Sequence, residues 1–307
     1  MHIDGVVPAC LLPLDHWLEI DEGAYSRHLD WLVSTPGVCA VTCNGHVAEV
    51  ATIDRAERRR AVAIAAETVA GRVPLISGLY ADDARDGVSL AKDAHEAGAD
   101  VLLVMPPNAM AYDADPRAAY RYFEQLSAAV PIRLIAFVYP HATGSMYSSE
   151  LLGQICRLDS VIAVKEWSLD IRTHERNYEV VKSADPSTSL LTSFSLSLLP
   201  ALVSGADGIL SGHGSVIAGL QVSLFNAVRS GDLPGARDIY ARVQKLTAVV
   251  YRDPIPNAYA RMKEQLIMLG HQLGSEVRPP LVPVAEDERR VLHRALVDAG
   301  LVPVPAR

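Results

Sequence analysis

No apolar run in the 307 residues approaches the roughly 20 consecutive residues that a bilayer-spanning helix needs. The N-terminal segment also lacks a basic stretch followed by an apolar one, so no secretory signal peptide is expected. Clusters of Lys and Arg are missing as well, and the net charge of −8 argues against a phosphate-binding surface. These absences predict a cytoplasmic protein with no membrane and no nucleic-acid partner.

Cysteine is scarce. The four residues, all in apolar surroundings, are Cys10, Cys39, Cys43 and Cys156. Cys39 and Cys43 form the single close pair, and their spacing differs from the CxxC of redox and zinc motifs. On one extended strand these two would lie about 13 Å apart, which is too far for a disulfide. We therefore expect buried, reduced thiols and no zinc site.

The composition is that of a globular protein. Half of the residues are hydrophobic and 21% are charged, which excludes a disordered chain. A chain of this length buries enough apolar surface to fold without disulfides or a metal. The one basic run, at 58–60, lies beside Glu57 and is interpreted as the solvated face of a helix.

Short apolar runs, rich in Val, Ile and Leu, alternate with longer amphipathic segments. Such runs are typical of parallel strands that are covered on both faces. They lie at 5–12, 37–43, 73–79, 100–106, 132–138, 161–165, 189–194 and 207–212. Eight strands alternating with helices favour an α/β fold, a (β/α)8 TIM barrel, over an open doubly wound sheet. No GxGxxG follows the first run, which argues against a dinucleotide-binding fold.

Helix signals lie between these runs. Asp54 and Glu57 fit a capping box, and Gly71 ends the helix-forming stretch that follows. The fragment Gly-Ala-Asp occurs at 98–100 and again at 205–207, each time between a helix and a strand. This recurrence indicates a repeated βα unit.

The C-terminal part continues beyond the eighth run. Residues 214–229 predict the last barrel helix, and several more helical stretches follow it. We therefore expect a catalytic barrel over 1–230 and a small C-terminal helical extension over 231–307.

Catalytic groups of a TIM barrel come from the C-terminal ends of its strands. Lys165 ends the sixth run, whereas the other four lysines lie in helical stretches. Because side chains alternate along a strand, Lys165 would point into the barrel mouth together with Val161 and Ala163. Desolvation there disfavours the ammonium form and produces a nucleophilic amine. The alternative is a rim lysine that reaches to water.

Two further strand ends carry candidate groups. The turn Gly45-His46-Val47 follows the second run, and its backbone N–H groups suit a carboxylate. His46 is a candidate acid or base, with a histidine satisfied by local hydrogen bonds as an equal alternative. Phe137 and Tyr139 end the fifth run on one face, where Tyr139 could shuttle protons or pack against a loop.

Together these segments resemble the dihydrodipicolinate synthase / N-acetylneuraminate lyase family of class I, pyruvate-type aldolases. Residues 164–168 match the Lys-Asp-x-Ser element of the family's Schiff-base lysine, and 45–49 occupy the place of its Gly-Thr-Thr-Gly-Glu loop. Further similar segments lie at 5–10, 72–78, 205–211, 253–256 and 278–281. The resemblance implies a Schiff base on Lys165 and a homo-oligomer, either a dimer or a tetramer.

The sequence departs from the family at the proton relay and the second substrate. The family's loop threonines are His46 and Val47 here, and its catalytic tyrosine aligns with Phe137, which cannot carry a proton. His46 is the candidate replacement, with Tyr139 in reserve. The arginine that clamps the second substrate aligns with Ala142. These departures predict a neutral or aromatic aldehyde and an enzyme other than a true dihydrodipicolinate synthase.

The resemblance therefore predicts a lyase or aldolase that joins or splits a 2-keto acid, such as pyruvate, and an aldehyde through an imine on Lys165. The amides of His46 and Val47 would hold the carboxylate, and Ser211 and Gly212 would line the keto-acid side. No metal or other cofactor is needed. Two alternatives stay open: a dehydratase that acts on a hydroxylated 2-keto acid through the same imine, and a barrel that has lost catalysis and only binds.

Overall fold

The computed structural model describes residues 1–110 and 115–302. Parallel strands form one sheet: β1 Gly5–Pro8, β2 Val41–Cys43, β3 Leu75–Leu79, β4 Val101–Val104, β5 Arg133–Val138, β6 Val161–Glu166, β7 Ser189–Thr192 and β8 Gly208–Ser211. Their order is β1-β8-β7-β6-β5-β4-β3-β2. Isolated parallel bridges join Val6 to Val38 and Ala9 to Thr42, which brings β1 to β2 and nearly closes the ring. The predicted (β/α)8 TIM barrel is confirmed.

Each of the eight predicted strands is present, and most are shorter than predicted. The run at 5–12, for example, contains β1, whereas residues 9–12 leave the strand and stay buried. A continuous apolar run indicates that both faces of a strand are buried, and this burial continues beyond the residues that form hydrogen bonds with the neighbouring strands.

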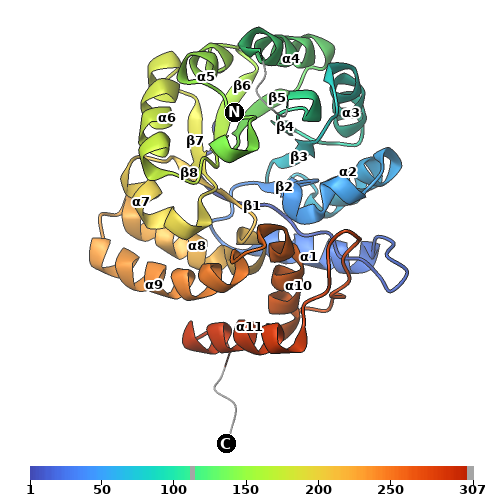
Figure 1. Cartoon of the computed structure of the whole chain (residues 1–307), viewed down its shortest axis with the longest axis vertical. Helices are drawn as coiled ribbons and strands as arrows, with labels where there is room; N and C mark the ends of the chain where they lie inside the picture. The colour runs from blue at the N-terminus through green and yellow to red at the C-terminus, as the bar shows by residue number, and fades with distance from the viewer. Residues whose placement is uncertain (111–114, 303–307) are drawn as a thin grey trace, which may run out of the picture.

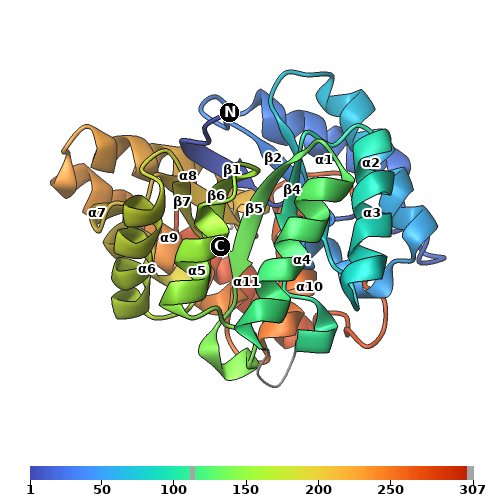
Figure 2. The same ribbon diagram turned by 90° about the horizontal axis from the view of Figure 1, so that it is seen from above.

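Helices cover the outside of the sheet, as Figures 1 and 2 show. They are α1 Glu22–Ser34, α2 Arg55–Val69, α3 Ala84–Glu96, α4 Pro116–Ala129, α5 Ser149–Cys156, α6 Ile171–Ala184, α7 Leu198–Val203 and α8 Gly214–Arg229. The predicted capping box of Asp54 and Glu57 begins α2. Ala70 and Gly71, both with positive φ, follow its last residue, so the predicted helix end is confirmed.

The repeated Gly-Ala-Asp fragment makes the same turn twice. Gly98 has a φ of +106° and Gly205 a φ of +107°, values that L side chains rarely adopt. The carboxylate of Asp100 accepts a hydrogen bond from the N–H of Leu75 at 2.8 Å, on the neighbouring strand β3. The carboxylate of Asp207 accepts one from the N–H of Leu190 at 2.7 Å, on the neighbouring strand β7. In each copy of the repeat, the Asp side chain thus links the start of one strand to the strand beside it.

The segment after α8 is helical. It contains α9 Leu233–Val250, η6 Ile255–Asn257, α10 Ala258–Met268 and α11 Glu286–Asp298. These elements lie together on one side of the barrel, in orange and red in Figure 1, where α9 packs against both α8 and α11. The division of the chain at residue 230 stays a prediction. Among the described residues, no helix combines the length and the apolar composition that crossing a bilayer requires.

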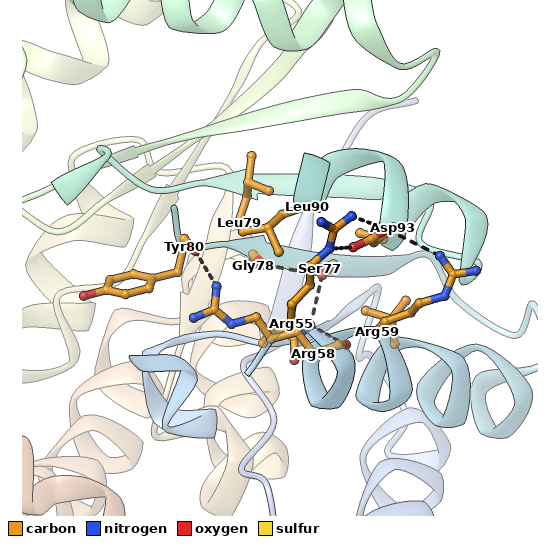
Figure 3. A pocket seen from close by; sticks show the side chains of 12 residues that line it. Arg55, Arg58, Arg59, Ser77, Gly78, Leu79, Tyr80, Leu90 and Asp93 are labelled. Carbon is orange, nitrogen blue, oxygen red and sulfur yellow. Dashed lines mark hydrogen bonds and ion pairs between the residues drawn. The ribbon is translucent and has the colours of Figure 1, made fainter. Parts of the chain in front are cut away.

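The basic run at 58–60 is a solvated helix face only in part. Arg59 and Arg60 are exposed and pair with acidic residues of neighbouring helices. The guanidinium of Arg58 instead turns inward and donates to the carbonyls of Val50 at 3.0 Å, Ile53 at 3.1 Å and Tyr80 at 2.6 Å, as Figure 3 shows for Tyr80. The sequence interpretation is wrong for Arg58, because the guanidinium supplies donors that these loop carbonyls otherwise lack.

The four cysteines are free. Cys10, Cys43 and Cys156 are buried, as predicted, whereas Cys39 is half-buried. Burial raises the pKa of the Cys43 thiol to about 12, so this group stays a thiol at neutral pH.

Candidate active site

A cavity opens at the C-terminal ends of the barrel strands. It contains about 460 Å³ of empty space, with its open mouth included. The lining residues come from several strand ends and from the segment after α9: Ala9, His46, Val47, Phe137, Lys165, Trp167, Ser193, Gly212, Tyr251, Ile255 and Tyr259. Within this described lining, Lys165 is the one lysine, arginine or carboxylate side chain, so the cavity is otherwise apolar, aromatic or neutral polar.

Lys165 lies near the C-terminal end of β6 and faces this cavity. Lys165 is only 6% exposed. This excludes the alternative in which the side chain lies at the rim of the barrel and reaches into water. In the described part of the chain, its Nζ has no hydrogen-bond or salt-bridge partner, and it lies 4.0 Å from the ring centroid of Phe137. Burial lowers the pKa of Lys165 to about 7. A large fraction of the amine is therefore uncharged and nucleophilic at neutral pH.

The turn after β2 places backbone donors at the cavity. Gly45 precedes the short 3-10 helix η1, His46–Ala48, and has extended backbone angles of φ −80° and ψ 177°. His46 and Val47 are the first residues of η1, so their N–H groups lack partners inside that helix. Both residues line the cavity, whereas Gly45 is buried behind them. Two amides at this position suit a carboxylate, as the sequence predicted.

His46 and Tyr139 are hydrogen-bonded to each other. The Nε2 atom of His46 lies 2.5 Å from the phenol oxygen of Tyr139. His46 lines the cavity and Tyr139 stands behind it, outside the described lining. Burial, and secondarily the charge of Lys165, lower the pKa of His46 to about 3, whereas burial raises the pKa of Tyr139 well above its usual value. Both groups are thus neutral at pH 7, and a change of imidazole tautomer reverses the direction of their hydrogen bond.

The low pKa of His46 differs from the sequence-based expectation. A histidine with its ordinary pKa would be a ready base near neutral pH, but this half-buried ring is poorly hydrated and lies near the charge of Lys165. A sequence gives the residue type and not its solvation, and solvation sets the proton affinity here.

Aromatic rings form one wall of the site. Phe137 lies in β5 and Tyr139 just after its end, and their ring centroids are 4.7 Å apart with planes inclined at 77°. The ring centroid of Phe137 lies 6.0 Å from that of Trp167, two residues after Lys165. It lies 5.8 Å from the ring centroid of His46. Such tilted and edge-to-face contacts hold each ring in one orientation.

The two predicted residues at the end of β8, Ser211 and Gly212, differ in their surroundings. Gly212 lines the cavity, and an added Cβ would come 2.4 Å from Cγ1 of Val47, so only glycine fits against the turn. The hydroxyl of Ser211 is instead fully buried, 2.9 Å from the hydroxyl of Ser195, and accepts a hydrogen bond from Gln221 at 3.1 Å. Ser211 is therefore not among the described lining residues, and its predicted contact with the substrate stays a prediction.

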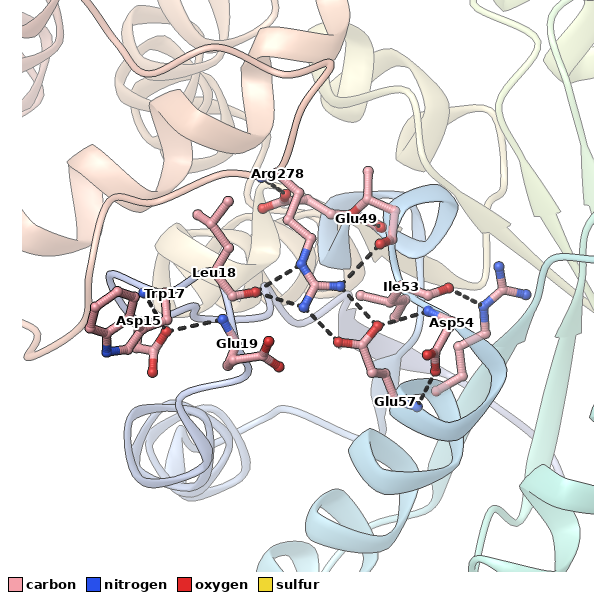
Figure 4. Close-up of polar contacts among 11 residues, drawn as sticks. Asp15, Trp17, Leu18, Glu19, Glu49, Ile53, Asp54, Glu57 and Arg278 are labelled. Carbon is pink, nitrogen blue, oxygen red and sulfur yellow. Dashed lines mark hydrogen bonds and ion pairs between the residues drawn. The ribbon is translucent and has the colours of Figure 1, made fainter.

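A buried ionic network fixes the turn from outside. Glu49, with a positive φ of 56°, follows η1, and its carboxylate accepts hydrogen bonds from Nζ of Lys263 at 2.6 Å and from the N–H of Arg278 at 2.9 Å. The guanidinium of Arg278 pairs with Glu57 at 2.5 Å and donates to the carbonyl of Leu18 at 2.6 Å, as seen in Figure 4. Segments from the C-terminal region thus hold the turn that presents the cavity amides.

We expect Lys263→Met to destabilise the fold by about 3–5 kcal/mol, because it leaves the carboxylate of Glu49 buried without its cation. Denaturant unfolding of the variant and the parent measures this difference. The matched control is Glu49→Gln combined with Lys263→Met, which removes both charges and should lose less stability than the single variant. A single variant as stable as the parent would contradict the bracing role.

Several lining residues were not singled out by sequence. Ala9 and Ser193 directly follow β1 and β7, so the same strand-end rule that selected Lys165 would have found them. Trp167 stands inside the matched motif at 164–168. Tyr251, Ile255 and Tyr259 come from the C-terminal helical segment, for which the barrel rule gives no signal.

Comparisons with known proteins agree over nearly the whole chain. A family model described as the dihydrodipicolinate synthetase family matches residues 2–299. The 4-hydroxy-tetrahydrodipicolinate synthase of Oleidesulfovibrio alaskensis is 28% identical over 307 residues, covering 98% of this chain and 100% of that protein. The synthase of the same name from Methanopyrus kandleri is 29% identical over 306 residues, which cover 98% of each chain.

Solved structures show the same fold. The dihydrodipicolinate synthase from Thermotoga maritima matches with a TM-score of 0.91 and 25% identity, covering 98% of this chain and 100% of that one. YagE, a prophage protein of the dihydrodipicolinic acid synthase family from E. coli K12 described in complex with pyruvate, matches with a TM-score of 0.90. It is 23% identical and covers 98% of this chain and 99% of that one, a likeness that concerns the fold alone.

Proposed function

The chain belongs to the dihydrodipicolinate synthetase family, whose members are lyases of the class I aldolase type, and we propose that it acts by binding a 2-keto acid as an imine on Lys165. The observation that carries this proposal is the buried amine of Lys165, which faces the cavity with no ion-pair partner in the described chain and has a pKa of about 7. An amine in this state attacks a ketone without first losing a proton to a strong base.

The keto acid is held at both ends in this proposal. Its carboxylate accepts hydrogen bonds from the N–H groups of His46 and Val47, two residues that line the cavity at the start of η1. Nζ of Lys165 then attacks the ketone carbon, and loss of water leaves an iminium. The positive nitrogen withdraws electrons, so the neighbouring carbon can lose a proton and become an enamine, which attacks an aldehyde. The reverse sequence splits the bond.

His46 and Tyr139 move the proton in this scheme. The charge of Lys165 contributes to the low pKa of His46, and a bound carboxylate would offset that charge. Substrate binding therefore raises the proton affinity of His46 when a base is needed. Because His46 and the phenol of Tyr139 are 2.5 Å apart, the two groups can pass a proton away from the cavity in one step.

The second substrate, in our proposal, is an uncharged aldehyde, with an aromatic one favoured. The described lining offers the rings of Phe137, Trp167 and Tyr251, and it offers no guanidinium that would hold a second carboxylate. Ala142, at the position of the family's arginine, lies exposed on a short 3-10 helix. The curated relatives carry the name 4-hydroxy-tetrahydrodipicolinate synthase, so the distinction from that activity rests on these lining residues alone.

The decisive test is reduction of the imine. The protein is incubated with pyruvate and borohydride, weighed intact and digested to map the adduct, with several other 2-keto acids in parallel. We expect a stable mass gain on Lys165. The absence of an adduct with every 2-keto acid would refute the proposal and favour a barrel that only binds. Analysis of products from turnover then separates a lyase, which releases an aldehyde, from a dehydratase, which does not.

A further inference from the structure

The geometry points to a catalytic role for Phe137: the face of its ring stabilises the positive charge on Nζ of Lys165, first as the ammonium and then as the iminium. The nitrogen lies 4.0 Å from the ring centroid. An aromatic face carries negative charge density, and a cation within about 6 Å of the centroid is attracted to it. Phe137 therefore acts through its ring face, since a phenyl ring holds no transferable proton.

The sheet fixes this contact. Phe137 and Lys165 are direct partners in the register of β5 and β6, so neighbouring parallel strands carry the two side chains to the same level of the barrel. Phe137 is 1% exposed, and the rings of Tyr139, Trp167 and His46 surround it. The ring cannot turn its edge toward the nitrogen without disturbing these neighbours.

The surroundings make the attraction strong. Nζ of Lys165 is removed from water and, in the described chain, has no carboxylate beside it. Water would screen a cation over an exposed ring, whereas a desolvated pair retains most of the interaction. The phenyl ring therefore favours the charged form of this nitrogen and partly opposes the effect of burial.

The effect on turnover, which rests on the proposed function, concerns imine formation. Nζ forms a bond to the ketone carbon, and the bond from that carbon to oxygen breaks. One proton from the amine and one taken up from solvent leave with the oxygen as water, so the nitrogen keeps one hydrogen and carries the positive charge. That charge stays over the face of Phe137, which lowers the free energy of the iminium relative to the neutral amine.

A fluorinated series tests the contact itself. Phe137 is replaced by 4-fluoro-, 3,5-difluoro- and 3,4,5-trifluorophenylalanine, which keep the ring's shape and progressively remove its negative face. The readout is the pKa of Lys165 in the enzyme without substrate, followed through its ¹³Cε chemical shift. The chain has only five lysines, and Lys165→Met identifies the signal by its loss.

We expect the pKa of Lys165 to fall stepwise, by about one unit across the series, because each fluorine weakens the stabilisation of the ammonium. The matched control is the same series at Phe123, a fully buried phenylalanine of α4 outside the cavity lining, which should leave this pKa unchanged. An unchanged pKa in the Phe137 series would overturn the inference. So would an equal fall in the Phe123 series.

The two proposals fail in different ways. If the parent forms no adduct with pyruvate and borohydride, the proposed function is wrong, whatever the fluorinated series shows. If the adduct forms and the pKa does not follow the fluorine content, the function stands and the role of Phe137 is wrong. With both correct, the rate of imine formation from the uncharged amine falls in the same order as the pKa, by about tenfold across the series.

Discussion

Lys165→Met abolishes imine trapping and turnover and, at the same time, makes the fold more stable. Methionine has a similar length and no charge, so it removes the nucleophile without leaving a large void. The gain follows from the lowered pKa of Lys165, about 7 in the fold against 10.5 as its ordinary value. At about 1.4 kcal/mol per unit, such a shift corresponds to roughly 5 kcal/mol of destabilisation by the buried amine, as an upper bound.

The pH dependence of this gain has a definite sign. The unfolded chain binds a proton at Lys165 up to pH 10.5, whereas the fold releases it near pH 7. The destabilisation is therefore complete below pH 7 and fades as the pH rises from 7 toward 10.5. Denaturant unfolding at several pH values should show the largest advantage of Lys165→Met at the lowest pH. Lys92→Met, at an exposed lysine of α3, is the control and should show neither effect. A methionine variant with a constant or negative stability difference would contradict the desolvated amine.

His46→Ala and Tyr139→Phe keep the imine and slow turnover. Neither substitution touches the nucleophile, so both variants should still give the borohydride adduct on Lys165. The exchange of pyruvate's methyl protons with deuterated water should fall by about 10²–10⁴-fold in each, because general acid–base catalysis contributes about that factor. Nuclear magnetic resonance measures this exchange directly.

The double variant distinguishes a relay from two separate effects. Since His46 and Tyr139 share one hydrogen bond, removing both should cost little more than removing either. If the fall in exchange rate of the double variant equals the product of the two single falls, the two side chains act independently. A His46→Ala variant that exchanges protons at the parent rate would exclude the relay altogether.

The sequence could predict the fold and the place of Lys165 at the barrel mouth because both follow from local rules. Apolar runs separated by amphipathic stretches define the barrel, and a strand-end lysine in a barrel points to its mouth. Ser211 shows the limit of such rules. It lies in β8 next to Gly212, and its hydroxyl bonds Ser195 and Gln221 instead of facing the cavity. Those partners are 16 and 10 residues away in sequence, and only the folded chain brings them together.

The proton affinity of the site was the least predictable property. The pKa of His46 depends on how much water reaches the ring and on the charge of Lys165, which is 119 positions away along the chain. The hydrogen bond from His46 to Tyr139 likewise crosses from the turn after β2 to the end of β5. Residue types alone therefore suggested His46 and Tyr139 as candidates and gave no sign that the two are hydrogen-bonded to each other.

The dependence of the cavity on residues beyond 250 has a consequence for how the protein is made. Tyr251 and Tyr259 form part of its wall, and Lys263 and Arg278 hold the turn at Glu49. A ribosome adds these residues after it has synthesised the described strands of the barrel, β1 to β8. The strands of a nascent chain can pair before that point, whereas the surroundings of Lys165 are assembled only after Arg278 has been added. A chain interrupted before residue 250 would therefore keep the strands and lack part of the cavity wall around Lys165.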